Sequence, residues 1–101
     1  MKLVWADSAL RDVDDILRYI RPRSPSGARN VAISINRAGA SCAELPFAGS
    51  KTRRSKVWRW PLTDRRMTIF YRVDVDNDTV EIIRVVRSGR VKNLRRLPDE
   101  N

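Results

Sequence analysis

Two amphipathic helical patterns follow one another with a short connection between them, and this arrangement constrains the fold more than any other feature of the sequence. Within residues 10–20, and again within residues 28–45, apolar side chains recur every three or four positions, which places them on one face of a helix. Two such helices joined by a short connection are expected to pack as an antiparallel hairpin. The stripes consist of Leu10, Val13, Ile16, Leu17 and Ile20, then of Ala28, Val31, Ile35, Ala38, Cys42 and Leu45.

Residues at the ends of these patterns predict where each helix begins and ends. Asp7 and Ser8 form a suitable capping pair for the first helix. Pro22 should end that helix near residue 21, because the residue before a proline disfavours the helical conformation. Ser24 and Pro25 then predict an N-cap followed by proline at the first position of the second helix.

The apolar period changes from helical to strand-like in the second half of the chain. Alternation predicts strands over residues 57–62 and 67–73, and residues 79–86 are nearly apolar on both faces, as expected of a central strand. A short apolar run predicts a first strand over residues 2–5. The segment 49–55 is expected to be a basic loop. The order strand, helix, helix, strand, strand, strand therefore predicts an α+β domain, with the helical hairpin packed against one face of a mainly antiparallel sheet.

Two kinds of side chain in these elements have more than one possible role. Trp58 and Trp60 alternate with Arg59, as in surfaces that stack on nucleic-acid bases, but they share a strand face with Leu62, and we favour core packing. Cys42 lies on the apolar stripe of the second helix, so we interpret it as a small core residue and not as a reactive thiol.

The length and composition indicate a single folded domain over residues 1–90, with a basic C-terminal extension over residues 91–101. No apolar run approaches the roughly 20 residues needed to span a bilayer, and no signal peptide is evident, so we expect a cytoplasmic protein with no membrane contact. The chain has no histidine and one cysteine, which argues against a zinc site and against histidine-dependent catalysis. We expect neither a metal nor a cofactor.

The net charge of +9 is concentrated in the second half of the chain. Residues 51–101 hold fourteen basic and seven acidic side chains, against seven and five in residues 1–50. Such clustering is typical of a surface that faces a polyanion, and nucleic acid or an acidic polypeptide would satisfy it equally. A merely solvated basic face is the remaining alternative.

Five short motifs follow one another in a characteristic order and spacing. They are Ala9-Leu10-x-Asp12-x-x-x-Ile16-x-x-Tyr19-Ile20, Ser24-Pro25-x-x-Ala28, Leu45-Pro46-x-x-Gly49, Phe70-Tyr71-Arg72-Val73 and Val80-Glu81-Ile82-Ile83-Arg84-Val85. The pattern resembles the RelE/ParE superfamily of type II toxin–antitoxin toxins over roughly residues 2–90, and the first half is more similar to ParE. The resemblance implies the same fold that the periodicities predict.

The resemblance also implies a partner and a target. An acidic cognate antitoxin would neutralise the toxin, and the ParE-like reading implies inhibition of DNA gyrase without an enzymatic role. RelE-like members instead cleave mRNA on the ribosome, which is the alternative reading, and a small basic nucleic-acid-binding module is a weaker one. The candidate residues for binding antitoxin or target are Arg53, Arg54, Lys56, Arg59, Arg66, Arg84, Arg87, Arg90 and Lys92.

A ribonuclease needs cations for the phosphorane charge and separate groups to move protons. Arg59, Arg66, Arg84 and Arg87 could supply the cations. RelE-like nucleases commonly place a tyrosine or histidine near the C-terminus, and this chain has neither after residue 84, so no proton-transfer group is assigned.

Arg84 interrupts an apolar strand and therefore needs a separate explanation. We favour an ion pair with a carboxylate of the helical hairpin, either Asp12 or Asp15, over direct contact with the target, because a buried charge requires a partner.

Overall fold

The computed structural model describes residues 1–54, 56–62 and 65–87. The predicted domain boundary at residue 90 and the predicted basic extension over residues 91–101 lie outside this range, as do the candidate residues Arg90 and Lys92.

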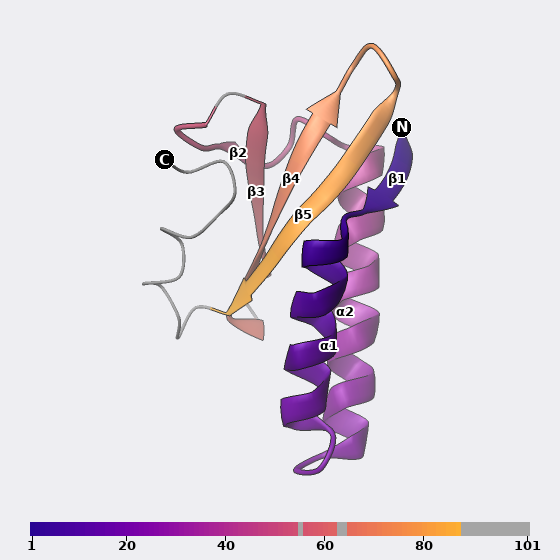
Figure 1. The fold of residues 1–101 in the computed structure, drawn as a ribbon, viewed down its shortest axis with the longest axis vertical. Helices are drawn as coiled ribbons and strands as arrows, with labels where there is room; N and C mark the ends of the chain where they lie inside the picture. Colours follow the sequence, from indigo (N-terminus) through magenta and orange to yellow (C-terminus); the bar gives the residue numbers. More distant parts are fainter. Residues whose placement is uncertain (55, 63–64, 88–101) are drawn as a thin grey trace.

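The described chain forms two helices and a five-stranded sheet (Figure 1). The strand order is β1-β5-β4-β3-β2, with β1 parallel to β5 and the other neighbours antiparallel. The predicted α+β fold is confirmed, including the helical hairpin and the mainly antiparallel sheet. The elements are β1 (Lys2–Trp5), α1 (Asp7–Ile20), α2 (Pro25–Glu44), β2 (Ser50–Lys51), β3 (Val57–Leu62), β4 (Met67–Asp74) and β5 (Thr79–Arg87).

The predicted basic loop over residues 49–55 is wrong in one respect, because it contains the short edge strand β2. Ser50 lies opposite Arg59, and Lys51 lies opposite Trp58. A strand of two residues has no measurable alternation, so its pairing depends on the neighbouring β3 and not on its own sequence.

The ends of the helices confirm one predicted cap and contradict the other. The Ser24 side chain accepts a hydrogen bond from the Gly27 backbone N–H at 3.0 Å, and Pro25 is the first residue of α2. The N-cap of α1 is Ala6, without a side-chain cap, so the predicted Asp7-Ser8 pair does not cap it. The Ser8 hydroxyl instead donates to the Ile83 carbonyl at 2.6 Å, because α1 begins beside the open edge of β5.

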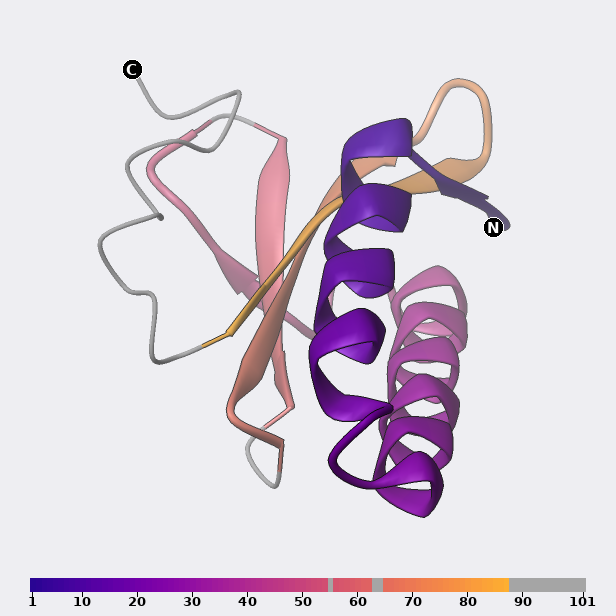
Figure 2. The same cartoon turned by 60° about the horizontal axis from the view of Figure 1, so that its bottom comes forward.

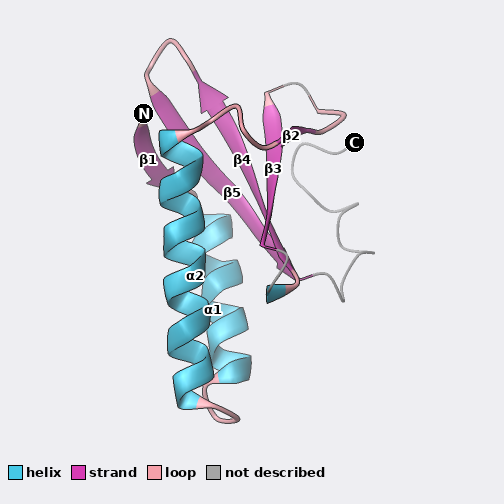
Figure 3. Ribbon diagram, turned by 180° about the vertical axis from the view of Figure 1, so that it is seen from behind, coloured by secondary structure: helices cyan, strands magenta, loops and turns pink. Residues whose placement is uncertain are grey.

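Both helices lie on one face of the sheet (Figures 2 and 3). Their stripes pack with the inward side chains of β3, β4 and β5, and Trp58 and Trp60 lie partly buried against this core, as predicted. Two members of the predicted stripes are exposed, however: Leu45 follows the last residue of α2, and Leu10 lines an outer groove between the helices. The buried cluster is Ala9, Ile16, Val31, Ile35, Ala38, Cys42, Ala43, Leu62, Met67, Ile69, Tyr71, Val73, Val80, Ile82 and Val85.

The centre of this core contains a thiol and a phenol that solvent does not reach. Cys42 and Tyr71 are both fully buried, and burial is the main cause that raises the pKa of each to about 12. The Tyr71 hydroxyl donates to the Pro46 carbonyl at 2.8 Å. Cys42 is therefore a core residue, as predicted, since its thiol remains protonated at neutral pH.

A smaller apolar cluster occupies the other face of the sheet. Val57, Phe70, Ile83 and Val86 are buried there. A β-bulge in the pairing of β4 with β5 makes this possible: Phe70 lies opposite Arg84 and Tyr71 opposite Ile82, so Ile83 has no opposite residue. The bulge interrupts the alternation of β5, which is apolar on both faces as predicted.

Candidate functional site

The candidate site lies where α1 runs along the open edge of β5. The strand β1 pairs with β5 only as far as Ile82, and beyond that point α1 replaces it. The Ala6 N–H donates to the Ile82 carbonyl at 2.9 Å, the Ser8 hydroxyl to Ile83, and the Val85 N–H to the Asp12 carboxylate at 2.9 Å. The start of α1 therefore provides hydrogen-bond partners for backbone groups of β5 that have no neighbouring strand beyond Ile82.

Arg84 is held by Asp12, as the sequence predicted, and not by Asp15. Its Nε donates to Oδ2 of Asp12 at 2.7 Å, and its Nη2 donates to Oδ1 at 3.0 Å. The side chains are only 23% and 16% exposed. These hydrogen bonds raise the pKa of Arg84 above its usual value, although burial opposes the rise. A bidentate pair that also accepts a backbone N–H fixes the end of β5 on α1.

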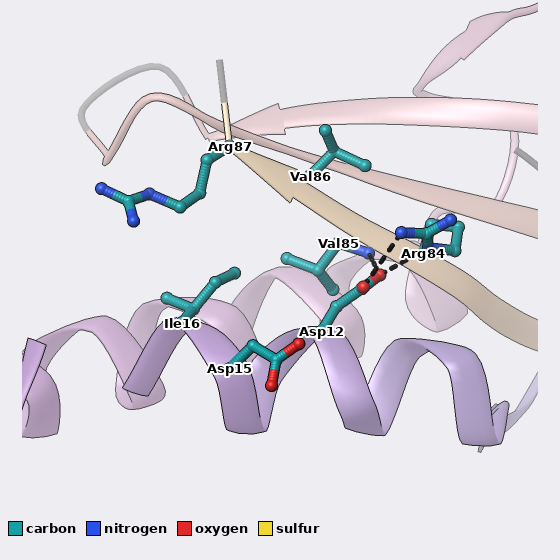
Figure 4. Close-up of a pocket in the computed structure, with 7 residues that line it drawn as sticks. All are labelled: Asp12, Asp15, Ile16, Arg84, Val85, Val86 and Arg87. Carbon is teal, nitrogen blue, oxygen red and sulfur yellow. Dashed lines mark hydrogen bonds and ion pairs between the residues drawn. The ribbon is translucent and has the colours of Figure 1, made fainter. Parts of the chain in front are cut away.

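A small cleft of about 70 Å³ opens beside this pair (Figure 4). Asp12, Asp15 and Ile16 of α1 line one side, and residues 84–87 of β5 line the other. Arg87 has no carboxylate within ion-pair distance among the described residues, in contrast to Arg84. The cleft therefore combines one neutralised arginine with one that is available to a ligand.

Tyr19 lies at the Arg87 end of this site, which we did not predict from the sequence. The guanidinium carbon of Arg87 is 4.9 Å from the centroid of the Tyr19 ring, and that of Arg23 is 4.0 Å from it. Tyr19 lies seven residues after Asp12 on the helix, a rise of roughly 10 Å, and Arg87 lies three residues after Arg84 on the strand, also roughly 10 Å. Once Arg84 is paired with Asp12, these equal rises place Arg87 beside Tyr19, so the predicted ion pair was a signal from which the Tyr19–Arg87 contact could have been found.

Arg59 belongs to the face of the sheet that the helices leave uncovered. It alternates with the core-packed Trp58 and Trp60, and it lies opposite Phe70, which in turn lies opposite Arg84. Arg59, Phe70 and Arg84 thus form one row across three strands, in which Arg59 is exposed and Arg84 is engaged by Asp12.

The remaining candidate cations divide between the two ends of the sheet. Arg66 precedes Met67, the residue opposite Arg87, so Arg66 and Arg87 lie at the same end. Arg53, Arg54 and Lys56 precede β3 at the other end, roughly 20 Å away, because Val57 lies opposite Arg72, five residues along β4 from Met67. The structure therefore does not gather the predicted residues into one site.

Two of these cations occupy the left-handed backbone region, which asparagine or glycine would adopt with less strain. Lys56 has φ 69° and Arg66 has φ 54°. Both side chains are exposed. Lys56 thus presents its cation directly before β3, and Arg66 presents its cation directly before β4.

The exposed arginines of the described chain are suited to binding anions. Residues 1–54, 56–62 and 65–87 contain no group of three or more histidine, cysteine or acidic side chains that could hold a metal ion. Guanidinium groups bind carboxylate or phosphate through two parallel N–H donors, which matches what Arg59, Arg66 and Arg87 can present.

A comparison with protein families decides the identity of this fold. Residues 3–92 match the family described as the ParE toxin of the type II toxin–antitoxin system, parDE. The chain belongs to the ParE toxin family. This agrees with the resemblance that the sequence motifs indicated. A curated relative, "Putative toxin Y4kP" of Sinorhizobium fredii, is 32% identical over 87 residues, covering 86% of this chain and 88% of its own length.

Solved structures of toxins share the fold. The chromosomal ParDE toxin–antitoxin system from P. aeruginosa matches with a TM-score of 0.76 at 21% identity, covering 86% of this chain and 95% of that one. The RelBE2 complex from Mycobacterium tuberculosis matches with a TM-score of 0.62 at 20% identity, covering 85% and 88%. A free-state variant of the E. coli toxin RelE matches with a TM-score of 0.65 at 13% identity, covering 95% and 90%.

Neither helix of the described part of the chain has the length and apolar character needed to cross a membrane.

Proposed function

We propose that this ParE-family toxin acts in the cytoplasm by binding and inhibiting DNA gyrase, and that an acidic cognate antitoxin neutralises it. The observation that supports the proposal most strongly is the match to the ParE toxin family over residues 3–92. The ParDE and RelBE systems whose structures share the fold are toxin–antitoxin pairs, which supports an antitoxin partner for this chain.

The geometry of Arg84 also favours an inhibitor over a nuclease. In a ribonuclease, this arginine would have to leave its carboxylate in order to stabilise charge on a phosphate. Here Asp12 accepts two hydrogen bonds from it and a third from the Val85 N–H. Arg84 is thereby committed to the contact between α1 and β5, which removes one of the four arginines considered for catalysis.

One observation favours the second candidate, a RelE-like ribosome-dependent mRNA endonuclease. The sequence has no tyrosine after residue 84, but the fold brings the phenol of Tyr19 beside Arg87. A phenol next to a guanidinium is the kind of group that can move a proton during phosphoryl transfer. The nuclease reading thus acquires a proton-transfer candidate that the linear sequence does not show.

Induction of the toxin in growing cells separates the two functions. We expect plasmid supercoiling to change and DNA breaks and filamentation to follow, while transcripts remain intact, because gyrase inhibition acts on DNA topology. Transcript integrity and plasmid topology should be followed in the same culture. Rapid transcript cleavage with unchanged supercoiling would reject gyrase inhibition and support the endonuclease.

A further inference from the structure

Three side chains form a cationic cluster at the end of α1 and β5. The Tyr19 ring has the Arg23 guanidinium at 4.0 Å and the Arg87 guanidinium at 4.9 Å from its centroid, both within the range of a cation–π contact. Nη1 of Arg23 also donates to the Tyr19 carbonyl at 2.7 Å. Tyr19 is 47% exposed, so the cluster is open to solvent.

The two arginines of the cluster differ from their neighbours in charge balance. Arg18, one residue before Tyr19, is paired with Asp14, and Arg84, three residues before Arg87, is paired with Asp12. Within residues 1–54, 56–62 and 65–87, no carboxylate lies within ion-pair distance of Arg23 or Arg87. The cluster therefore concentrates two positive charges that the described part of the chain does not neutralise.

Holding two guanidinium groups against one ring has a cost and a benefit. The like charges of the two guanidinium groups repel one another, and the attraction of each to the ring quadrupole offsets part of that repulsion. Contact with a rigid ring also restricts the rotamers of both arginines, so less conformational entropy is lost when an anion binds. The arrangement is thus organised in advance for an anionic group.

The surroundings favour a carboxylate of a protein over the phosphates of a nucleic acid. The phosphates of a nucleic acid repeat without interruption, so its binding surface needs a continuous positive track. Here Arg66 is exposed at the same end of the sheet, but the cations at the Lys56 end lie roughly 20 Å away, and Asp15 lines the cleft next to Arg87. An acidic peptide can place its carboxylates where the cations are.

We infer that Tyr19 is a positioning residue that holds Arg87, together with Arg23, as a binding site for a carboxylate of an acidic protein partner. The inference rests on the proposed function only in that such a partner exists. Arg87 contacts the carboxylate, and Tyr19 acts through Arg87.

Binding of two labelled polyanions to the purified full-length chain tests this inference. The probes are a peptide of ten glutamates and a single strand of ten deoxythymidines, followed by fluorescence anisotropy at low salt. We expect Arg87→Gln to weaken peptide binding about fivefold, the upper range for an exposed ion pair. Tyr19→Leu should weaken it about threefold, and Tyr19→Phe should have little effect because the ring remains.

The double variant and a matched control make the result specific. If Tyr19 acts mainly through Arg87, then Tyr19→Leu in the Arg87→Gln background should cause a smaller loss of peptide binding than Tyr19→Leu alone, because only Arg23 is then left for the ring to hold. Arg37→Gln removes the same charge from an exposed position on α2 and should change binding less than twofold. Circular dichroism confirms that each variant is folded.

Three outcomes would overturn the inference. The first is an undiminished affinity for the peptide in Tyr19→Leu, or losses that simply add in the double variant. The second is an equal loss in Arg37→Gln, which would show a general effect of charge. The third is tighter binding of the oligonucleotide that the same variants weaken, which would assign the cluster to phosphate. None of these results depends on gyrase inhibition, so failure here leaves the proposed function to its own test.

Discussion

Replacement of Asp12 by alanine is expected to lower the free energy of unfolding by about 3 kcal/mol, because a largely enclosed arginine loses its partner. The carboxylate accepts hydrogen bonds from Nε and Nη2 of Arg84 and from the Val85 N–H. All three are lost in the variant, and the polar groups left behind lie at the contact between α1 and β5. Urea denaturation of the purified variant measures the change.

Asp15→Ala is the matched control for this prediction. Asp15 lies on the same helix and lines the same cleft, but no hydrogen bond or ion pair joins it to the described residues. Its removal should change stability by no more than about 0.5 kcal/mol. Equal unfolding midpoints for the two variants would contradict the account of the Arg84–Asp12 pair.

Arg84→Met separates a structural role of this arginine from a functional one. The unbranched apolar side chain of methionine fills the space of the aliphatic stem but leaves the Asp12 carboxylate with only the Val85 N–H. We expect a loss of stability, with toxicity that falls only in proportion to the folded fraction. A fully folded variant without toxicity would show that Arg84 contacts the target directly.

The second large effect is expected at Gly49, where the chain passes over the buried Tyr71. A Cβ atom on Gly49 would lie 2.4 Å from the Tyr71 hydroxyl oxygen and 2.6 Å from the Arg59 carbonyl oxygen. Real Cβ atoms do not approach so closely, and neither neighbour is the free end of a flexible side chain. Gly49→Ala should therefore displace Tyr71 from the Pro46 carbonyl and cost about 3 kcal/mol of stability.

A double variant tests this mechanism against a general effect of the loop. Tyr71→Phe removes the hydroxyl, so in that background the further cost of Gly49→Ala should be smaller, although the contact with the Arg59 carbonyl persists. The exposed neighbour Ser50, changed to alanine, should have little effect. If Gly49→Ala unfolds at the same urea concentration as Ser50→Ala, the close approach is not a constraint on the fold.

The sequence was most informative where one side chain pattern extends over several turns or strands. The stripes of α1 and α2 and the alternation in β3 and β4 predict the observed elements, because burial of one face is a property of many residues together. The ion pair of Arg84 followed from the cost of burying a charge inside an apolar strand.

Features that depend on the end of a neighbouring element were not predictable in the same way. Serine is a residue type that often caps helices, but the Ile83 carbonyl lies close to Ser8 and accepts the hydrogen bond from its hydroxyl instead. The pairing of β2, the bulge at Ile83 and the exposure of Leu10 also depend on where another segment stops or turns. Such features become visible only when the elements are placed beside one another.

In the candidate site, too, the residue types were predictable from the sequence, whereas their arrangement depends on neighbouring elements. Individual cations were identified from their types, but their separation into two ends of the sheet follows from the register of β3 and β4. Tyr19 lies on the first helix, far from Arg87 in the sequence, and its contact with Arg87 follows from the matched rise of α1 and β5.

The most direct test of the proposed function is the supercoiling of relaxed plasmid by purified DNA gyrase in the presence of the purified toxin. We expect inhibition that increases with toxin concentration, and we expect no cleavage of mRNA by the same preparation on programmed ribosomes. Unchanged gyrase activity, with mRNA cut in the ribosomal A site, would contradict the account.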